Sequence, residues 1–168
     1  MTMATRLPPV LLVAVLLHTA LAPQLRVFGV AADLMLLIAV AAGVAAGADR
    51  GAIVGFGAGL LADCFLQTPF GLSALAYCLV GWGVGSFQST ILHAAWWIPV
   101  VTVAAASAAG VALYAGIGAV VGQGHLVSGR LVGIIAVVAV LNAVLSPVAV
   151  RVMRWATLSR SAPGLVLR

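Results

Sequence analysis

ADLMLLIAVAAGVAAGADRG, residues 32–51, runs directly into AIVGFGAGLLADCFLQTPFGLSALAYCLVGWGVG, residues 52–85. The apolar runs of this stretch are interrupted at four places: Asp33, Asp49–Arg50, Asp63 and Gln67–Pro69. Long uninterrupted apolar runs are typical of membrane-spanning helices, because a helix bonds all of its backbone groups internally and so tolerates lipid. The stretch therefore predicts a hairpin of two membrane helices followed by a third.

The composition of the whole chain indicates the same class of protein. Hydrophobic residues make up 64% of the 168 residues and charged residues 7%, and the mean hydropathy is +1.26. Soluble domains contain roughly 45–50% apolar and about 25% charged residues. No polar stretch is long enough to form a soluble domain with its own core. We therefore expect an all-α integral membrane protein with a single transmembrane domain over residues 1–168.

Six membrane-spanning helices are predicted, at residues 7–25, 30–48, 52–66, 70–87, 94–121 and 131–150, followed by a short tail at residues 151–168. The first segment also resembles a secretory signal, because Arg6 precedes an apolar run that ends in Ala20-Leu21-Ala22. Pro23 directly after that ending would hinder cleavage, so we expect the first helix to be retained. The length of the fifth segment predicts either a tilted helix or a start at the membrane interface.

The arginines predict the orientation of the chain. If both termini are cytoplasmic, six of the eight basic residues lie inside: Arg6, Arg50, Arg151, Arg154, Arg160 and Arg168. Only Arg26 and Arg130 then lie outside, which is the arrangement that the positive-inside rule favours. Clustering at helix ends also argues against a nucleic-acid site, which needs a basic patch on a folded surface.

In this orientation two acidic residues lie near the outer face. Asp33 opens the inward-running second segment, and Asp63 closes the outward-running third segment beside the Pro69–Gly71 turn. In one interpretation Asp33 caps its helix and Asp63 pairs with Arg26 or Arg130. In the other, both acids belong to a polar outer pocket that binds a ligand or a partner, because carboxylates near lipid are usually paired or line a cavity.

Glycines at four-residue spacing indicate close helix packing. The pairs are Gly43/Gly47, Gly55/Gly59 and Gly81/Gly85. Each pair leaves a smooth groove on its helix that a neighbouring helix can approach closely. We expect the neighbours to come from this chain, with a helix of a partner protein as the alternative.

No catalytic or metal-binding motif is recognisable in the sequence. GxSxG and HExxH are absent, and an intramembrane hydrolase built on Ser73 and His125 lacks any recognisable spacing. The three histidines are isolated from one another, and Cys64 and Cys78 lie in apolar runs without a CxxC motif. We therefore predict no enzymatic activity, no cofactor and no metal site.

Three consecutive motifs resemble the core of the MreD family of rod shape-determining proteins. They are DLMLL at residues 33–37, GAIVGFGAGLLAD at residues 51–63 and TPFGLSAL at residues 68–75. The ordered combination of G-x3-G-x3-G, an Asp four residues after the last Gly and T-P-x-G-L-S is more specific than any one of its parts. The resemblance covers roughly residues 33–85, and it departs from the family at Ala32, where a Pro is usual.

The resemblance implies a membrane scaffold rather than a catalyst. MreD proteins are six-span proteins of the bacterial inner membrane that work with MreC, MreB, RodA and its partner transpeptidase in lateral peptidoglycan synthesis. Their fold is similar to that of the substrate-binding subunits of energy-coupling-factor vitamin transporters. The positions carried over are Asp33, Gly55, Gly59, Asp63, Pro69, Gly71 and Ser73. The resemblance implies that the glycines pack helices and that the acids, with the turn that also includes Phe70, form an outer pocket or an MreC contact.

The alternative function is that of such a transporter subunit, binding a small vitamin-like solute. Those subunits dock their transmembrane partner through small residues four apart on the first helix. Here Ala14 and Ala22 each lie four residues from His18, so the first segment offers no such pair. The sequence therefore favours the scaffold.

Overall fold

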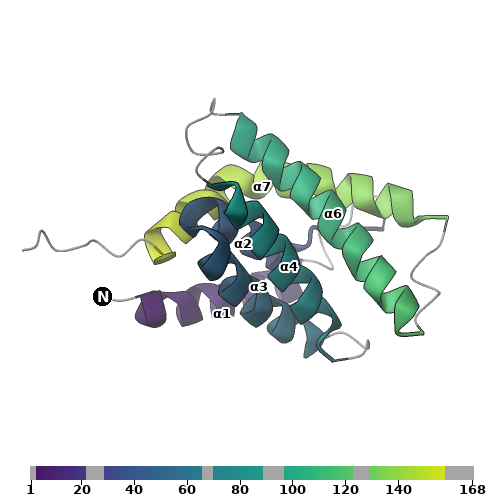
Figure 1. Ribbon diagram of the computed structural model, residues 1–168, viewed down its shortest axis with the longest axis horizontal. Helices are drawn as coiled ribbons and strands as arrows, with labels where there is room; N and C mark the ends of the chain where they lie inside the picture. The colour runs from purple at the N-terminus through teal and green to yellow at the C-terminus, as the bar shows by residue number, and fades with distance from the viewer. Residues whose placement is uncertain (1–2, 22–28, 66–69, 89–96, 123–128, 158–168) are drawn as a thin grey trace, which may run out of the picture.

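Six helices form the part of the chain that the computed structural model describes, namely residues 3–21, 29–65, 70–88, 97–122 and 129–157, and no β-strand occurs within those ranges. The helices are α1 (Met3–Leu21), α2 (Leu34–Ala46), α3 (Ala48–Asp63), α4 (Leu72–Ser86), α6 (Ile98–Val120) and α7 (Leu131–Thr157). The prediction of an all-α chain is confirmed. Figure 1 shows α2, α3 and α4 gathered together, with α6 and α7 crossing beside them and α1 along one edge.

The central helix is α2, and every residue from Met35 to Ala45 is buried. It contacts all five of the other helices. Its 13 residues span about 20 Å at 1.5 Å per residue, less than the ~30 Å of a bilayer's hydrocarbon core. A helix surrounded by protein need not match the lipid, so α2 is shorter at both ends than the segment predicted at residues 30–48.

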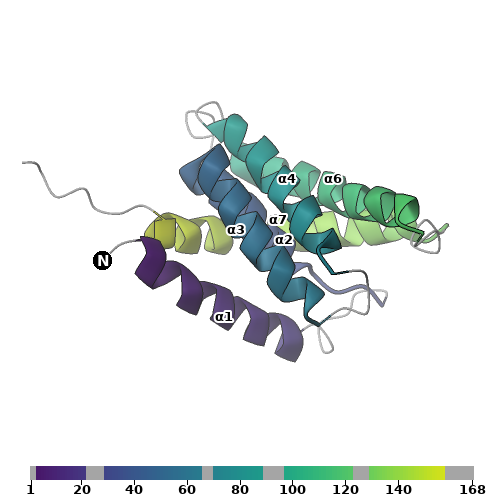
Figure 2. The same cartoon turned by 60° about the horizontal axis from the view of Figure 1, so that its bottom comes forward.

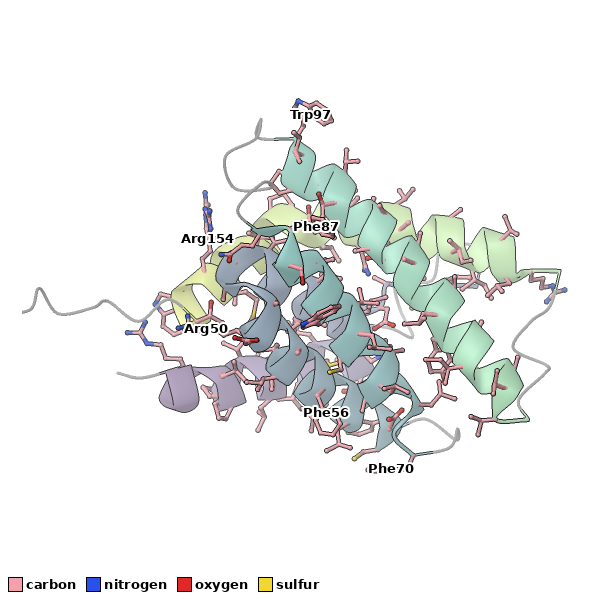
Figure 3. All side chains as sticks on the ribbon, viewed as in Figure 1. Arg50, Phe56, Phe70, Phe87, Trp97 and Arg154 are labelled. Carbon is pink, nitrogen blue, oxygen red and sulfur yellow. The ribbon has the colours of Figure 1, made fainter. Side chains whose placement is uncertain are left out.

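Successive helices run in opposite directions, which gathers several arginines at one end of the molecule. Arg6 near the start of α1 donates from Nη1 to the carbonyl of Trp155 at 3.0 Å, and Arg50 near the start of α3 donates to the carbonyl of Thr157 at 2.7 Å. The last carbonyls of a helix have no partner within it and carry partial negative charge, so both contacts stabilise the end of α7. The helix consequently continues beyond residue 150, where the sixth predicted segment ends. Arg50 and Arg154 lie on one side of the molecule and Phe70 on the other (Figure 3).

Two of the described helices, α6 and α7, are long and apolar enough to cross a membrane. Shorter apolar helices run over Arg6–Ala20, Leu34–Ala46 and Leu72–Ser86. Pro99 lies in the first turn of α6, where its missing N–H leaves no hydrogen bond unmade.

Glycines bring α3 and α4 into direct backbone contact. A Cβ placed on Gly55 would lie 2.3 Å from the Tyr77 carbonyl oxygen, and one on Gly59 would lie 2.4 Å from the Ser73 carbonyl oxygen. On the α4 side, a Cβ on Gly81 would lie 2.4 Å from the carbonyl oxygen of Gly51. Further along, one on Gly85 would lie 2.4 Å from the backbone nitrogen of Ala48. Real Cβ atoms essentially never approach another atom within 3.0 Å, so this glycine seam admits no side chain at any of the four positions.

The glycine seam predicts a large difference between two glycines of α3. Gly55→Ala is expected to lower the free energy of unfolding by about 1–3 kcal/mol, because its methyl group forces the two backbones apart. Gly57→Ala is the matched control, since its nearest neighbour would be Leu11 Cδ1 at 3.8 Å, an ordinary contact. Unfolding of both variants in mixed micelles by SDS titration measures the difference, and equal stabilities would contradict the close approach.

Candidate functional site

Asp63, the last residue of α3, holds the beginning of α4. Its Oδ2 accepts hydrogen bonds from the backbone N–H groups of Gly71 at 2.9 Å and Ala74 at 3.3 Å, and its Oδ1 accepts one from Ser73 at 3.1 Å. The first N–H groups of a helix have no intrahelical acceptor, and they favour a negative charge. The Asp63 side chain is buried, so these bonds compensate for the loss of its hydration. The carboxylate thus caps α4 from the end of α3.

The residues around this cap have different surroundings. Gly71 adopts a left-handed conformation with φ of 99°, which glycine takes without strain. Phe70 is 68% exposed. Ser73 is fully buried, and its hydroxyl oxygen has no hydrogen-bond partner among the described residues. Pro69 and Arg26 lie outside the described residues, whereas Arg130 is exposed and forms no ion pair with Asp63 in the described part of the chain.

Asp33 caps α2 and also reaches α4 (Leu72–Ser86). Its Oδ1 accepts a hydrogen bond from the backbone N–H of Leu36 at 3.0 Å, the N-cap arrangement that one interpretation of the sequence predicts. Its Oδ2 accepts a hydrogen bond from the hydroxyl of Tyr77 at 2.5 Å. The two acids thus hold α4 at two points, Asp63 through its first N–H groups and Asp33 through Tyr77.

Asn142 of α7 extends this polar cluster to two more helices. Its Nδ2 donates to the carbonyl oxygen of Asp33 at 3.2 Å and to Ser107 Oγ of α6 at 3.0 Å. Asn142 and Ser107 are both fully buried. A buried amide needs such partners in an apolar surrounding. The side chain acts only as a donor, because its buried Oδ1 has no hydrogen-bond partner among the described residues.

A cavity of about 270 Å³, with mostly apolar walls, lies beside Asp33. Its polar lining is contributed by four side chains, those of His18, Asp33, Tyr77 and Tyr114, and its walls otherwise consist of alanine, valine and isoleucine. A carboxylate retains acceptor capacity after two hydrogen bonds, so the cavity offers a small polar group an acceptor within apolar walls. Asp63 does not line it. The two acids therefore occupy separate places, although both contribute to holding α4.

Tyr77 and Tyr114 are the residues of this site that the sequence reasoning missed. Neither falls in a recognised motif, and periodicity does not distinguish them from their apolar neighbours. A usable signal existed, because a tyrosine within an apolar helix usually requires a partner for its hydroxyl group. Within the described residues no group of three or more potential metal-ligating side chains occurs. Cys64 and Cys78 are both free thiols, while His93 and His125 lie outside the described ranges.

The Asp63 cap gives a prediction about stability. Asp63→Asn is expected to lower the free energy of unfolding by about 1–3 kcal/mol. In the wild type three N–H groups share the two oxygens of a charged carboxylate, whereas the neutral amide of the variant has only one acceptor oxygen. Asp49→Asn is the control, since Asp49 lies exposed in the first turn of α3 and caps no other helix. SDS titration of both variants measures the effect, and a loss no larger than that of Asp49→Asn would contradict a capping role.

Comparison with known proteins identifies the family. The profile of rod shape-determining protein MreD matches residues 2–155 of the 168-residue chain. No curated protein and no solved structure matches the chain. The match extends on both sides of the three motifs that carry the resemblance and includes all of the described helices except the last two residues of α7. The chain therefore belongs to the MreD family of rod shape-determining proteins.

Proposed function

We propose that this chain is a non-catalytic membrane scaffold of the bacterial cell-elongation machinery, which binds MreC and helps to direct lateral peptidoglycan synthesis. The match to the MreD family over residues 2–155 carries the proposal, since that family is defined by rod-shape determination. MreB, RodA and its partner transpeptidase are the further components with which this scaffold would work.

The scaffold spans the inner membrane six times, with both termini in the cytoplasm. The positions of the arginines support this orientation, because Arg6 and Arg50 both meet the final turn of α7. A basic end of this kind is retained on the cytoplasmic side during insertion. In this orientation the Asp63 cap, Phe70 and the cavity beside Asp33 lie toward the outer face.

The use made of the buried polar groups favours a scaffold over a catalyst. Asp63 binds three backbone N–H groups, Asp33 binds one N–H group and a phenol, and Asn142 joins α7 to α6 and to the start of α2. Except for the bond from the Leu36 N–H to Asp33, which caps α2 itself, each of these bonds fixes one helix relative to another. Such cross-links make a rigid surface, which lowers the conformational entropy that a partner must remove on binding.

The outer turn before α4 is the proposed MreC contact. Phe70 projects from it with 68% of its surface exposed, and the next residue, Gly71, is fixed by its hydrogen bond to Asp63. An exposed aromatic ring on a fixed backbone is a typical anchor of a protein interface. Asp33, Pro69 and Ser73 complete the proposed outer site, with Asp33 and Ser73 acting through the positions they give to α2 and α4.

A second candidate function is favoured by the cavity beside Asp33, because a few polar groups, namely a carboxylate, two phenols and an imidazole, among apolar walls suit a small solute that carries a polar group. A substrate-binding subunit of a vitamin transporter would use such a cavity. The predicted likeness to the fold of those subunits has no support among solved structures. Purification from native membranes with identification of the associated chains separates the two functions, since a scaffold brings MreC and a transporter subunit brings an ATPase pair.

The proposed contact predicts that truncation of Phe70, before the start of α4, weakens MreC binding, whereas truncation of Phe87, after its end, does not. Phe70→Ala is expected to weaken MreC binding roughly thirtyfold, the effect of losing an interface anchor worth about 2 kcal/mol. Phe87→Ala is the matched control, because Phe87 is 67% exposed and Phe70 is 68% exposed, but they lie on opposite sides of the molecule (Figure 3). Co-purification of MreC with each variant from membranes gives the readout.

The outcomes distinguish the contact from the function. Loss of MreC with Phe87→Ala but not with Phe70→Ala would place the contact at the end of the molecule where Arg6 and Arg50 meet the last turn of α7. Absence of MreC from every preparation, including that of the wild type, would overturn the scaffold itself.

A further inference from the structure

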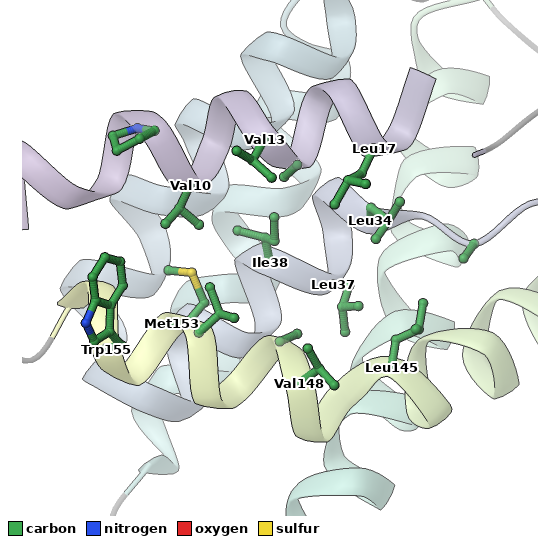
Figure 4. A pocket seen from close by; sticks show the side chains of 15 residues that line it. Val10, Val13, Leu17, Leu34, Leu37, Ile38, Leu145, Val148, Met153 and Trp155 are labelled. Carbon is green, nitrogen blue, oxygen red and sulfur yellow. The ribbon is translucent and has the colours of Figure 1, made fainter. Parts of the chain in front are cut away.

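A large apolar groove separates α1 (Met3–Leu21) from α7 (Leu131–Thr157). Its volume is about 540 Å³, and α2 (Leu34–Ala46) forms its floor. Figure 4 shows side chains of α1 and α7 facing one another across it: Val10, Val13, Leu17, Val148, Met153 and Trp155. Figure 2 shows α1 lying apart along the edge of the helix assembly. The groove therefore lies at the periphery, where a bilayer would meet the protein.

One end of the lipid groove, as we call this space, carries a positive charge. The Arg6 guanidinium lies 4.9 Å from the centroid of the Trp155 ring, and Trp155 lines the groove. Arg6 Nη1 is hydrogen-bonded to the Trp155 carbonyl, but its Nε is buried and has no partner within the described chain. No carboxylate pairs with Arg6 among the described residues, because Asp33 and Asp63 bond to α2 and α4 and Asp49 is exposed. A guanidinium carries five N–H donors, and one of those on Nη1 is used by the Trp155 carbonyl, so the Nη groups rather than the buried Nε supply the donors for an anion.

We propose that the lipid groove binds one acyl chain of an anionic phospholipid, whose phosphate pairs with Arg6. The shape of the site matches the two parts of this ligand, an apolar channel for the chain and a cation at its end for the phosphate. A guanidinium binds phosphate oxygens with paired N–H groups and is less strongly hydrated than an ammonium. In the orientation proposed above, the lipid belongs to the cytoplasmic leaflet, where anionic headgroups attract basic side chains.

The volume of the groove favours an acyl chain over a partner's helix. A spanning helix about 10 Å wide and ~30 Å long occupies roughly 2,400 Å³, several times the 540 Å³ that the groove provides. The groove lies within the ~300–1,000 Å³ typical of small-ligand sites. Each methylene group that leaves water for such a site contributes about 0.8 kcal/mol, but a chain that leaves bilayer lipid gains little. Selectivity for this site must therefore come from the headgroup at Arg6.

Native mass spectrometry of the full-length protein in mild detergent tests the proposal, with palmitoyl-oleoyl phosphatidylglycerol and the matching phosphatidylcholine as probes. The wild type is expected to retain one phosphatidylglycerol in preference to phosphatidylcholine. Arg6→Gln is expected to weaken phosphatidylglycerol binding about fivefold, the effect of one basic residue worth about 1 kcal/mol at an anionic headgroup. Arg130→Gln is the charge control, because Arg130 precedes the start of α7, at the other end of the molecule.

Filling the groove gives a second test that does not depend on Arg6. Val148→Trp is expected to abolish retention of both lipids. Val148 lines the groove and is 66% exposed, so the larger indole ring of the variant would occupy the groove in place of an acyl chain. Val144→Trp is the matched control, since Val144 lies one turn earlier on α7, is 72% exposed and does not line the groove.

Three outcomes would overturn the proposal. The first is equal retention of phosphatidylglycerol by the wild type and Arg6→Gln, and the second is equal loss of lipid in Val148→Trp and Val144→Trp. The third is cross-linking of a photoreactive residue at position 148 to another protein chain rather than to lipid. These results would leave the MreC scaffold intact, because its test depends on Phe70, which does not line the groove.

Discussion

The close approach of α3 and α4 is the constraint on which the rest of the structure depends. Gly55 and Gly59 on α3 and Gly81 and Gly85 on α4 leave no side chain at four points of the contact, so that backbone atoms of one helix lie against backbone atoms of the other. In lipid, where apolar side chains gain little by leaving their surroundings, such contact is a main source of helix association. It also fixes α4 in position, and α4 carries both the N–H groups that Asp63 caps and the phenol that Asp33 binds.

The helices and their close contact could be predicted from the sequence because both depend on local patterns. An uninterrupted apolar run predicts a helix, and each of the six predicted segments corresponds to one described helix, of which α6 and α7 are long and apolar enough to cross a membrane. The spacing of Gly55 and Gly59 similarly indicates a groove on α3, but it does not say which helix packs into that groove. The structure shows that this helix is α4. The extent of α7 also required the structure, because its last carbonyls are bonded to Arg6 and Arg50 from distant parts of the chain.

The polar site illustrates what a sequence pattern leaves undetermined. The predicted topology places Asp33, before the start of α2, and Asp63, at the end of α3, on the same side of the membrane, and a single shared pocket is one reasonable interpretation. In the structure each acid finds different partners, a neighbouring helix start for Asp63 and its own helix start plus Tyr77 for Asp33. Backbone N–H groups act as partners in both cases, and they leave no trace in residue identity. The contribution of Tyr77 depends on the rotation of α4, which the glycine seam sets.

Helix α1 packs less closely against the other helices than α3 and α4 pack against each other, because it lacks the glycines that allow backbone contact. Only Leu11 and Ala14 among its described side chains are buried, while Leu12, Val13, Leu16 and Leu17 remain exposed. Where α3 and α4 meet, absent side chains permit backbone contact, whereas most of the residues of α1 and α7 that face the groove carry larger side chains, such as Leu17, Val148 and Trp155. Arg6 and Trp155 join α1 and α7 at one end. A space held open by large apolar groups and bordered by bilayer does not fill with water, which would find no hydrogen-bond partners there. Lipid is the remaining material at hand, and the charge of Arg6 gives one class of lipid an advantage over the others.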